Sequence, residues 1–374
     1  MKKPKYLILI FLITLFLITL FPFSSKPVFS NHQQHNLIEQ GKIFYDSGRY
    51  SEAINLLKQA ASKYKFDGNK LNQAASLSNM SLAYQKLGQL QEAEKTINLS
   101  IQLLQSLPKN VPKNKSINKI YAQSLDVKGK LQFAQGKFQN AIVTWEKSEN
   151  IYAYLDLQSA LIQSRINQVQ AMQALGLFIK AQNTLISVRE ILDKQPDSAL
   201  KSLGLRSLGD VLRIIGNVDE SKKVLLESLQ VASSLKDNRQ ISETLISLGN
   251  VFRIEQDTAS QSLAIKYYQQ AANIAHSNSD LGLQAQLNLL NLLVKMEKFD
   301  SAKQLLPQIS TEIQNLSLNR KSISLCVNYA ITLTKLKQKT TVQTLSWLDI
   351  AQILTTAIQQ AVIIKDYRVD SYAL

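Results

Sequence analysis

Few residues in this sequence have the types and spacings that covalent or metal chemistry needs. The three histidines are His32, His35 and His276, and Cys326 is the single cysteine. His32 and His35 flank a predicted processing site, so we expect neither to bind a metal. His276 lies in "NIAHSNSD", where we expect a helix end that a positive charge would suit. A catalytic cysteine–histidine dyad would have to pair Cys326 with His276. The apolar run "SLCVNYA" predicts a buried structural thiol instead.

The motifs of the common enzyme classes do not occur in the sequence. It has no glycine-rich phosphate loop, no HExxH pair and no GxSxG elbow. The carboxylates Asp219 and Glu220, in "VDES", fall at an expected helix start, where acids cap backbone N–H groups. We therefore predict a protein that is not an enzyme and has no catalytic, cofactor-binding or metal-binding residues.

The composition is basic and favours helices. The net charge is +15, the chain has only 12 Gly and 7 Pro, and 45% of its residues are hydrophobic, which suits a folded core. A basic surface permits an acidic protein, an anionic lipid or a nucleic acid as partner. The lysines are spread along the chain, whereas a nucleic-acid binder usually gathers cations and aromatics in one stripe. We expect a protein or peptide partner, no nucleic acid and no small-molecule substrate.

Any binding residues must be positioned by a short element that the sequence repeats. In each copy a glycine or polar residue is followed two places later by an aromatic or aliphatic residue, and three places after that by a small one. A spacing of about 40 residues with helical composition is typical of a solenoid of stacked helices. The copies are Gly48/Tyr50/Ala53, Gly88/Leu90/Ala93, Gly136/Phe138/Ala141, Gly176/Phe178/Ala181, Gly216/Val218/Ser221, a looser one ending at Ala264, and Glu297/Phe299/Ala302.

The first copy shows why each unit should be a pair of helices. "HNLIEQGKIFYDS" has apolar residues in helical rhythm and is ended by Gly48, because glycine accepts the left-handed backbone of a helix cap. "YSEAINLLKQAASKY" is the partner helix. The small residues Gly41, Ala53 and Ala60 would let the two helices approach closely. One pair cannot bury its own apolar face, so neighbouring pairs must stack on both sides.

This pattern resembles the tetratricopeptide repeat. The matched positions are Leu37, Gly41, Phe44, Gly48, Tyr50, Ala53, Leu57 and Ala60 in the first copy, and Leu248, Gly249 and Phe252 in the sixth. The resemblance implies an all-α fold, a right-handed α-solenoid of stacked helix-turn-helix units. We expect about seven helix pairs over residues 34–333 and a degraded or truncated repeat over 334–374.

Several segments depart from the repeat. Ser221 and Ser228 replace alanines, and "RIEQDTASQSL" stretches the sixth turn. Proline and lysine in "LPKNVPKNKSINK" (107–119) predict a loop or a frayed helix end, and "TKLKQKTTVQTLSW" (334–347) lengthens the last unit. Both segments are expected at the surface. An alternative for the first is contact with anionic groups, such as lipid headgroups.

Residues 1–30 form a separate segment. Lys2, Lys3 and Lys5 precede an apolar run from Tyr6 to Phe23, and small residues follow as far as Ser30. This order predicts a secretory signal peptide that is removed before Asn31. The alternative is an uncleaved anchor through residues 6–23, since about 18 apolar residues are just long enough to span a membrane. We therefore expect the rest to be exported, to the periplasm or the extracellular space, or to be anchored in a membrane.

The resemblance also implies a binding surface. In tetratricopeptide proteins the first helices line a concave groove that holds an extended peptide or a partner helix. Arg213 and Arg253 occupy equivalent places in "GDVLRIIG" and "GNVFRIEQ", and an arginine fork suits a carboxylate. We therefore expect an acidic or C-terminal peptide at the fifth and sixth repeats, although these could be ordinary solvated side chains. The partner-binding candidates are Lys42, Tyr45, Gln85, Lys130, Gln170, Arg206, Arg213, Asn250 and Arg253.

A narrower resemblance concerns the protein's role. "SLGNVFR", "AIKYYQQAANIA" and "KDYRVDSYAL" make the chain similar to the N-terminal half of cyanobacterial CHAT-domain proteins. It implies a non-catalytic scaffold, the recognition half of a protein whose caspase-like peptidase domain is not in this sequence. The alternatives are a regulator associated with such a peptidase, and a membrane-tethered assembly factor for photosynthetic or envelope complexes.

Overall fold

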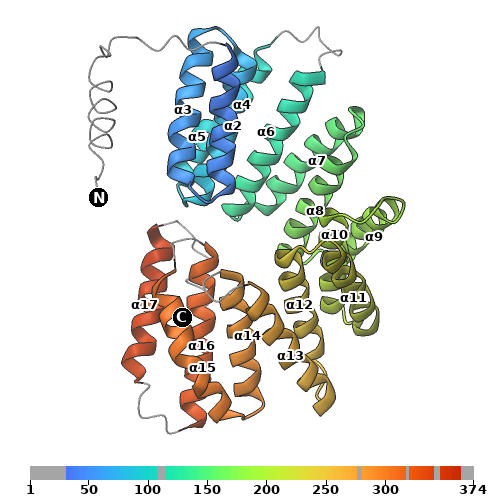
Figure 1. Cartoon of the computed structure of the whole chain (residues 1–374), viewed down its shortest axis with the longest axis vertical. Helices are drawn as coiled ribbons and strands as arrows, with labels where there is room; N and C mark the ends of the chain where they lie inside the picture. The colour runs from blue at the N-terminus through green and yellow to red at the C-terminus, as the bar shows by residue number, and fades with distance from the viewer. Residues whose placement is uncertain (1–30, 108–114, 276–279, 317–319, 341–345, 364–374) are drawn as a thin grey trace, which may run out of the picture.

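The computed structural model describes residues 31–107, 115–275, 280–316, 320–340 and 346–363. Within these ranges every regular element is an α-helix, and sixteen helices follow one another as eight pairs (Figure 1). The predicted all-α solenoid is therefore confirmed for this part of the chain. The predicted signal peptide or anchor (1–30), the side chains of His32 and His35, and His276 lie outside the described residues.

Each pair has a first helix that packs against the first helices of the neighbouring pairs. These first helices are α2 (Asn31–Asp46), α4 (Lys70–Lys86), α6 (Lys115–Ala134), α8 (Gln158–Ala174), α10 (Ala199–Ile214), α12 (Asn238–Phe252), α14 (Asp280–Lys295) and α16 (Arg320–Lys339). The second helices are α3 (Tyr50–Phe66), α5 (Leu90–Gln105), α7 (Phe138–Tyr154), α9 (Phe178–Leu192), α11 (Val218–Ser234), α13 (Thr258–Ala275), α15 (Phe299–Gln314) and α17 (Trp347–Ile363).

The turn inside a pair is built by a glycine with a left-handed backbone. Gly48 has φ 79°, its N–H donates to the Tyr45 carbonyl at 3.1 Å, and the Arg49 N–H donates to the Phe44 carbonyl at 2.8 Å. These two bonds close the end of α2 and start α3 within three residues. The same turn recurs at the predicted glycines, from Gly88 to Gly216, and in the seventh pair Glu297 takes this backbone without being a glycine, with φ 59°.

A second set of glycines lets the two helices of a pair touch. A Cβ atom on Gly209 would lie 2.5 Å from Cγ of Leu225, and one on Gly41 would lie 2.8 Å from Cγ of Leu57. These separations are far below van der Waals contact, so the large side chain of the second helix fills the space that the glycine leaves. The close approach predicted at Gly41 is confirmed, and the same arrangement recurs where Gly249 faces the Tyr268 ring.

The serines that replace alanines are hydrogen-bonded in the core. Ser221 and Ser228 are fully buried. The Ser221 hydroxyl donates to the Gly209 carbonyl at 2.7 Å, and the Ser228 hydroxyl donates to the Ser202 carbonyl at 2.9 Å. Because each hydroxyl has a partner on α10, these positions tolerate serine without leaving a buried polar group unsatisfied.

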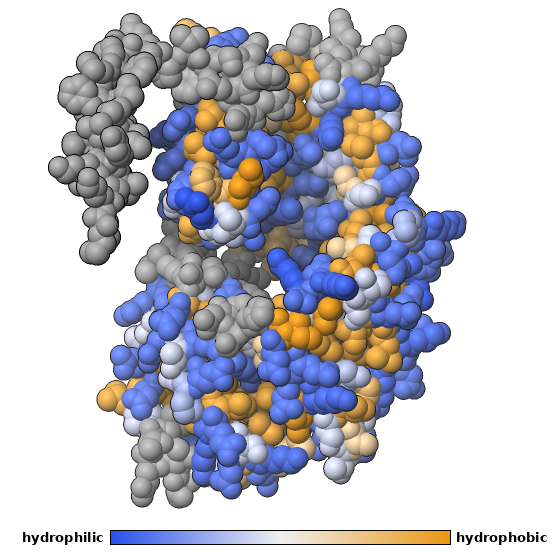
Figure 2. Space-filling model, in the orientation of Figure 1, coloured by the Kyte–Doolittle hydropathy of each residue, from blue (hydrophilic) through white to orange (hydrophobic). Residues whose placement is uncertain are grey.

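The stacked pairs curl into a nearly closed arc. Figure 1 shows the N-terminal helices and α17 on the same side of the molecule, with α9 and α11 at the opposite outer edge and α8, α10 and α12 inside them. Figure 2 shows a hollow between the two arms, with hydrophilic side chains at its edge. None of the described helices is both long and apolar enough to cross a membrane.

The C-terminal repeats differ from the prediction. Seven helix pairs and one further repeat were expected, and the described chain has seven pairs up to Gln314 and an eighth made of α16 and α17, but the boundary predicted at residue 334 falls inside α16. The reason is that one apolar face continues across this point, since Leu325, Tyr329, Leu333 and Leu336 are all buried. The loop predicted over 107–119 is also shorter, because α6 begins at Lys115. The turn inside the sixth pair, between α12 and α13, is longer than the turns of the five pairs before it, as predicted.

Candidate functional site on the inner face of the arc

The inner faces of α10 and α12 carry the same arrangement of polar residues. Arg206, Asp210 and Arg213 are spaced by four and then three residues, which places them on one side of α10. Glu243, Ser247 and Asn250 repeat this spacing on α12. Since α10 and α12 are neighbouring first helices in contact, the two sets face each other.

Arg206 is held by an ion pair between the two helices. Its Nη2 lies 2.7 Å from Oε2 of Glu243, and both side chains are about one-fifth exposed. Glu243 also accepts from Nε of Arg239 at 3.1 Å, within α12. Both carboxylate oxygens of Glu243 are thus occupied. Arg206, one of the predicted partner-binding residues, joins two repeats through this ion pair.

Asp210 lies between the two arginines of its own helix. The Ser247 hydroxyl donates to Asp210 Oδ2 at 3.0 Å, and Nε of Arg213 lies 4.0 Å from Oδ1. Burial raises the pKa of the Asp210 carboxyl, while the charges of Arg206 and Arg213 and the Ser247 hydroxyl oppose the rise. At 4.0 Å the Arg213 contact is electrostatic and not a hydrogen bond, and Arg213 Nε is buried with no hydrogen-bond partner among the described residues.

Asn250 is fixed by two donors from later helices. The Tyr268 hydroxyl donates to Asn250 Oδ1 at 2.8 Å, and Asn288 Nδ2 donates to the same oxygen at 3.4 Å. Burial raises the pKa of Tyr268, and the charges of Arg253 and Arg213 lower it. The Nδ2 group of Asn250 has no partner among the described residues, so it remains a donor for a ligand.

Arg253 is the remaining predicted partner-binding residue in this part of the chain. It follows the last residue of α12, and its backbone N–H donates to the Gly249 carbonyl at 3.0 Å. Its guanidinium makes no ion pair or hydrogen bond within the described part of the chain. The structure therefore brings together four predicted site residues, which are Arg206, Arg213, Asn250 and Arg253.

The other five candidates lie on earlier helices, outside this network. Lys42 is exposed and pairs with Glu39 at 3.8 Å, and Gln85 donates to the Val127 carbonyl at 3.2 Å, which links α4 to α6. The Tyr45 ring packs edge-on to Tyr50, with centroids 5.4 Å apart, and burial, with smaller effects of Tyr50 and Asp46, raises its pKa to about 12. Lys130 and Gln170 are exposed on α6 and α8.

Sequence reasoning missed the residues that hold this network in place. Glu243 and Ser247 could have been found, because they repeat the spacing of the α10 residues. Tyr268 could not, because it lies on a second helix at the position where its ring fills the space beside Gly249. Asn288 could not have been found either, because only its place on α14, the first helix of the following pair, relates it to Asn250.

A second buried carboxylate lies away from the inner network. Asp126 on α6 accepts from the Tyr152 hydroxyl at 2.7 Å and from the Ser148 hydroxyl at 2.7 Å. Ser164 on α8 donates to it at 3.3 Å. Burial raises the pKa of Asp126, and these hydrogen bonds and the charge of Lys130 oppose the rise. All of its close partners belong to three packed helices, so Asp126 has a structural role.

The chemistry that the inner network offers is recognition. It presents guanidinium and amide donors, which suit carboxylates and peptide carbonyls. No group of three or more His, Cys, Asp or Glu side chains able to hold a metal occurs among the described residues. Cys326 is buried as predicted, and burial raises the pKa of its thiol.

Comparison with known proteins identifies the repeat. The family model described as "Tetratricopeptide repeat" matches residues 35–106. Residues 35–106 are tetratricopeptide repeats. The matched range covers the first two helix pairs, and the third, fourth, fifth and seventh pairs repeat the same left-handed turn. No curated protein sequence matches the chain. The narrower resemblance to CHAT-domain proteins stays a prediction.

Solved structures with the same fold extend over most of the chain. The apo form of RapI has a TM-score of 0.57 at 13% identity and covers 76% of this chain and 100% of its own. A Rap protein complexed with competence and sporulation factor has a TM-score of 0.57 at 12% identity, covering 92% and 96%. Aspartyl phosphate phosphatase F from Bacillus subtilis has a TM-score of 0.58 at 11% identity, covering 76% and 71%. At these identities the likeness concerns the fold.

Proposed function

We propose that this tetratricopeptide-repeat chain is a non-catalytic binding scaffold that holds an extended acidic peptide along α10, α12 and α14. The observation that carries the proposal is the position of Asn250. Tyr268 and Asn288 occupy its carbonyl oxygen, so its amide donors are available to a peptide carbonyl, and the charges of Arg213 and Arg253 act on the Tyr268 hydroxyl that donates to it.

The energetics favour a charged ligand at this place. Arg253 has no ionic partner in the described part of the chain, and the contact of Arg213 with Asp210 is long, at 4.0 Å. A ligand carboxylate could therefore gain a charge-assisted hydrogen bond without first breaking a short ion pair. The fold supports the idea, since one Rap protein of similar fold was crystallised with competence and sporulation factor.

The test uses a fluorescein-labelled peptide of eight glutamates and the full chain. We expect saturable binding by fluorescence anisotropy that weakens as salt is raised. Arg253→Glu should reduce the affinity at least tenfold, and Arg213→Glu with Arg253→Glu should abolish binding. Asn250→Ala should weaken it by about two- to tenfold, the value of one hydrogen bond.

Lys223→Glu is the matched control, because it reverses the same charge on an exposed residue of α11, a second helix. Arg253→Glu is the decisive variant, since it breaks no ion pair among the described residues. Equal losses in the two variants, or no binding to the unaltered chain, would overturn the proposal. Binding that does not change with salt would indicate an apolar helix in the groove and remove the acidic part of the proposal.

The cellular location belongs to the same proposal and rests on residues 1–30 alone. We expect this scaffold to act outside the cytoplasm, either free or held by residues 6–23. Intact-mass measurement of the native protein in membrane and soluble fractions tests this. A chain that starts at Asn31 would support removal of the segment, a membrane-bound chain that keeps it would support the anchor, and a much heavier chain would support the CHAT-type alternative.

A further inference from the structure

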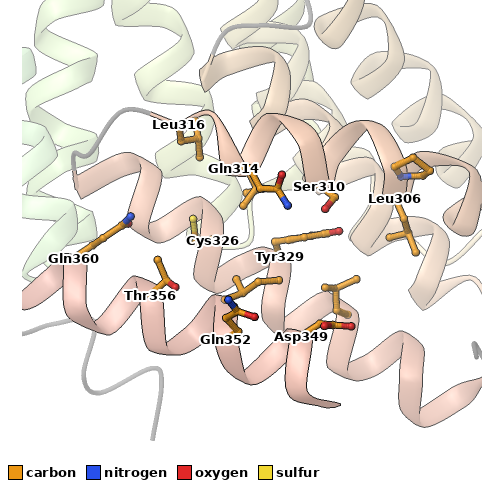
Figure 3. Close-up of a pocket in the computed structure, with 14 residues that line it drawn as sticks. Leu306, Ser310, Gln314, Leu316, Cys326, Tyr329, Asp349, Gln352, Thr356 and Gln360 are labelled. Atoms are coloured by element: carbon orange, nitrogen blue, oxygen red, sulfur yellow. The ribbon is translucent and has the colours of Figure 1, made fainter. Parts of the chain in front are cut away.

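A groove lies between α15 and α17, at the C-terminal end of the described repeats. It has a volume of about 630 Å³. Figure 3 shows its construction: Ser310 and Gln314 come from α15, Cys326 and Tyr329 from α16 at the base, and Gln352 and Thr356 from α17. The groove shares no residue with the inner network, so a ligand bound in it would be independent of the proposed peptide.

The groove exists because α15 does not close onto the next helix. Earlier second helices, such as α7 and α13, pack closely along the first helix of the next pair. By contrast, α15 makes few contacts with α16. Pro307 lies inside α15, where it lacks the N–H that would continue the helical ladder. The space left between α15 and α16 is then bounded by α17, the last described helix.

The base of the groove is apolar and buried. Leu333 is 1% exposed, Tyr329 is 4% exposed and Cys326 is 8% exposed, although all three line the groove. Ile313 on α15 and Ile353 on α17 form part of the two walls. A ligand that reached this base would cover apolar surface, which is the main source of affinity in small-molecule sites.

Equivalent grooves in earlier repeats can be compared with this one in volume and lining. Between α5 and α7 it measures about 220 Å³, and Gln135 bridges it by donating to Glu94 at 2.8 Å. Between α7 and α9 it measures about 450 Å³, and Glu149 is paired there with Arg165 at 2.7 Å. Both are lined by charged residues that bond within the groove. The α15–α17 groove has no lysine or arginine in its lining.

The lining determines the kind of ligand. Its polar members are neutral hydroxyl and amide groups, apart from Asp349 at one end, which accepts from the Ser346 N–H at 3.1 Å in a cap at the start of α17. An anionic ligand would lose its hydration without meeting a cation, which is costly. A volume of about 630 Å³ falls within the range of small-molecule sites and is too small for a folded element.

We propose that the α15–α17 groove binds a neutral amphipathic small molecule, with its apolar body against Tyr329, Ile353 and Leu333 and a hydroxyl or amide end among Gln314, Gln352 and Gln360. The molecule is a ligand that bridges α15 and α17 and not a substrate, since no group in the lining is placed to activate it. Its binding would brace the last two repeats.

Two adjacent threonines on α17 give a matched test. Thr356 lines the groove, whereas Thr355 is also exposed but does not line it. The probe is Nile red, an uncharged apolar dye, titrated into the full chain. We expect one saturable site. Thr356→Phe should fill the groove and weaken binding at least tenfold, while Thr355→Phe should change it less than twofold.

Cys326 gives an independent readout in the unaltered protein, because it is the only cysteine and lies at the base of the groove. Saturating Nile red should slow the reaction of this thiol with a disulfide reagent at least fivefold. Thermal melting of both phenylalanine variants establishes that they are folded. Equal effects of the two substitutions, or a thiol reaction that the dye does not slow, would overturn the proposal.

Discussion

At the scale of single residues, buried polar groups join neighbouring repeats. The Ser228 hydroxyl on α11 lies 3.2 Å from the Thr244 hydroxyl on α12, and Asp126 on α6 accepts from hydroxyls of α7 and α8. Each group sits between packed helices, where an unpaired polar atom would be expensive. The repeats are therefore held in register by specific hydrogen bonds as well as by apolar contact.

Asp126 gives a prediction about pH. Its pKa is raised in the folded protein, because burial outweighs the hydrogen bonds and the charge of Lys130 that oppose it. The folded state then binds the proton more tightly than the unfolded state, so this residue's contribution to stability is greatest below its unfolded pKa and is lost as the pH rises through its folded pKa. We expect the free energy of unfolding, relative to that of Asp126→Asn, to increase as the pH is lowered through this window.

Urea unfolding of both proteins at a series of pH values between about 3 and 7 measures that difference, a range that spans the ordinary pKa of an aspartate. Asp156→Asn is the control, since Asp156 is an exposed carboxylate at the end of the same helix pair. A difference that grows with rising pH would contradict the prediction.

At the scale of elements, the distance between the two helices of a pair is set by a glycine facing a large side chain. Gly209 on α10 faces Leu225 on α11, and a Cβ atom there would lie 2.5 Å from Cγ, a branch point that cannot swing away. Gly204 on the same helix is less tight, since its nearest neighbour is a terminal methyl of Leu192 at 3.0 Å. Both glycines lie within α10, so the two sites differ mainly in how closely a neighbouring side chain approaches and in whether it can move.

We expect Gly209→Ala to lower the free energy of unfolding by about 1–3 kcal/mol, the usual cost of overpacking. Alanine also favours a helix over glycine by about 1 kcal/mol, so Gly204→Ala, where Leu192 can move, should be close to neutral. Guanidinium unfolding of the two variants measures the contrast. If Gly209→Ala and Gly204→Ala had the same effect on the free energy of unfolding, the close contact of Gly209 with Leu225 would not set the distance between α10 and α11.

At the scale of the whole molecule, the arc brings like charges together across its opening. Lys86 ends α4, and Arg239 is the second residue of α12, far along the sequence. Burial lowers the pKa of Lys86, and the charges of Arg239 and Lys130 lower it further. Lys86 is nevertheless exposed to water. Cationic residues of α4, α6 and α12 therefore repel one another through solvent.

This repulsion should make the curvature depend on salt. The screening length falls from about 10 Å at 0.1 M salt to about 3 Å at 1 M, so the two arms should approach as salt is added. We expect the radius of gyration from small-angle X-ray scattering to decrease with salt in the unaltered chain. The double variant Lys86→Gln with Arg239→Gln should show a smaller change. A radius that rises with salt would contradict the prediction.

The sequence by itself determined what depends on local spacing. The left-handed turns at Gly48 and its equivalents, the glycine opposite Leu57 and the alternation of apolar faces all follow from residues within one repeat. It also marked Arg213 and Arg253 as related positions, since they share a place in successive repeats, and it placed Asn250 one turn before Arg253. These features are readable because the 3.6-residue period of a helix fixes which side chains lie together.

Only the tertiary structure decided which of those residues are free. Arg206 is bound to Glu243 on the next first helix, and Asn250 is fixed by Tyr268 and Asn288 from two later helices. Such pairs depend on the register between helices, which is set by how closely each pair packs and is not encoded in any single repeat. The α15–α17 groove has the same origin, because it arises where one helix fails to close onto the next.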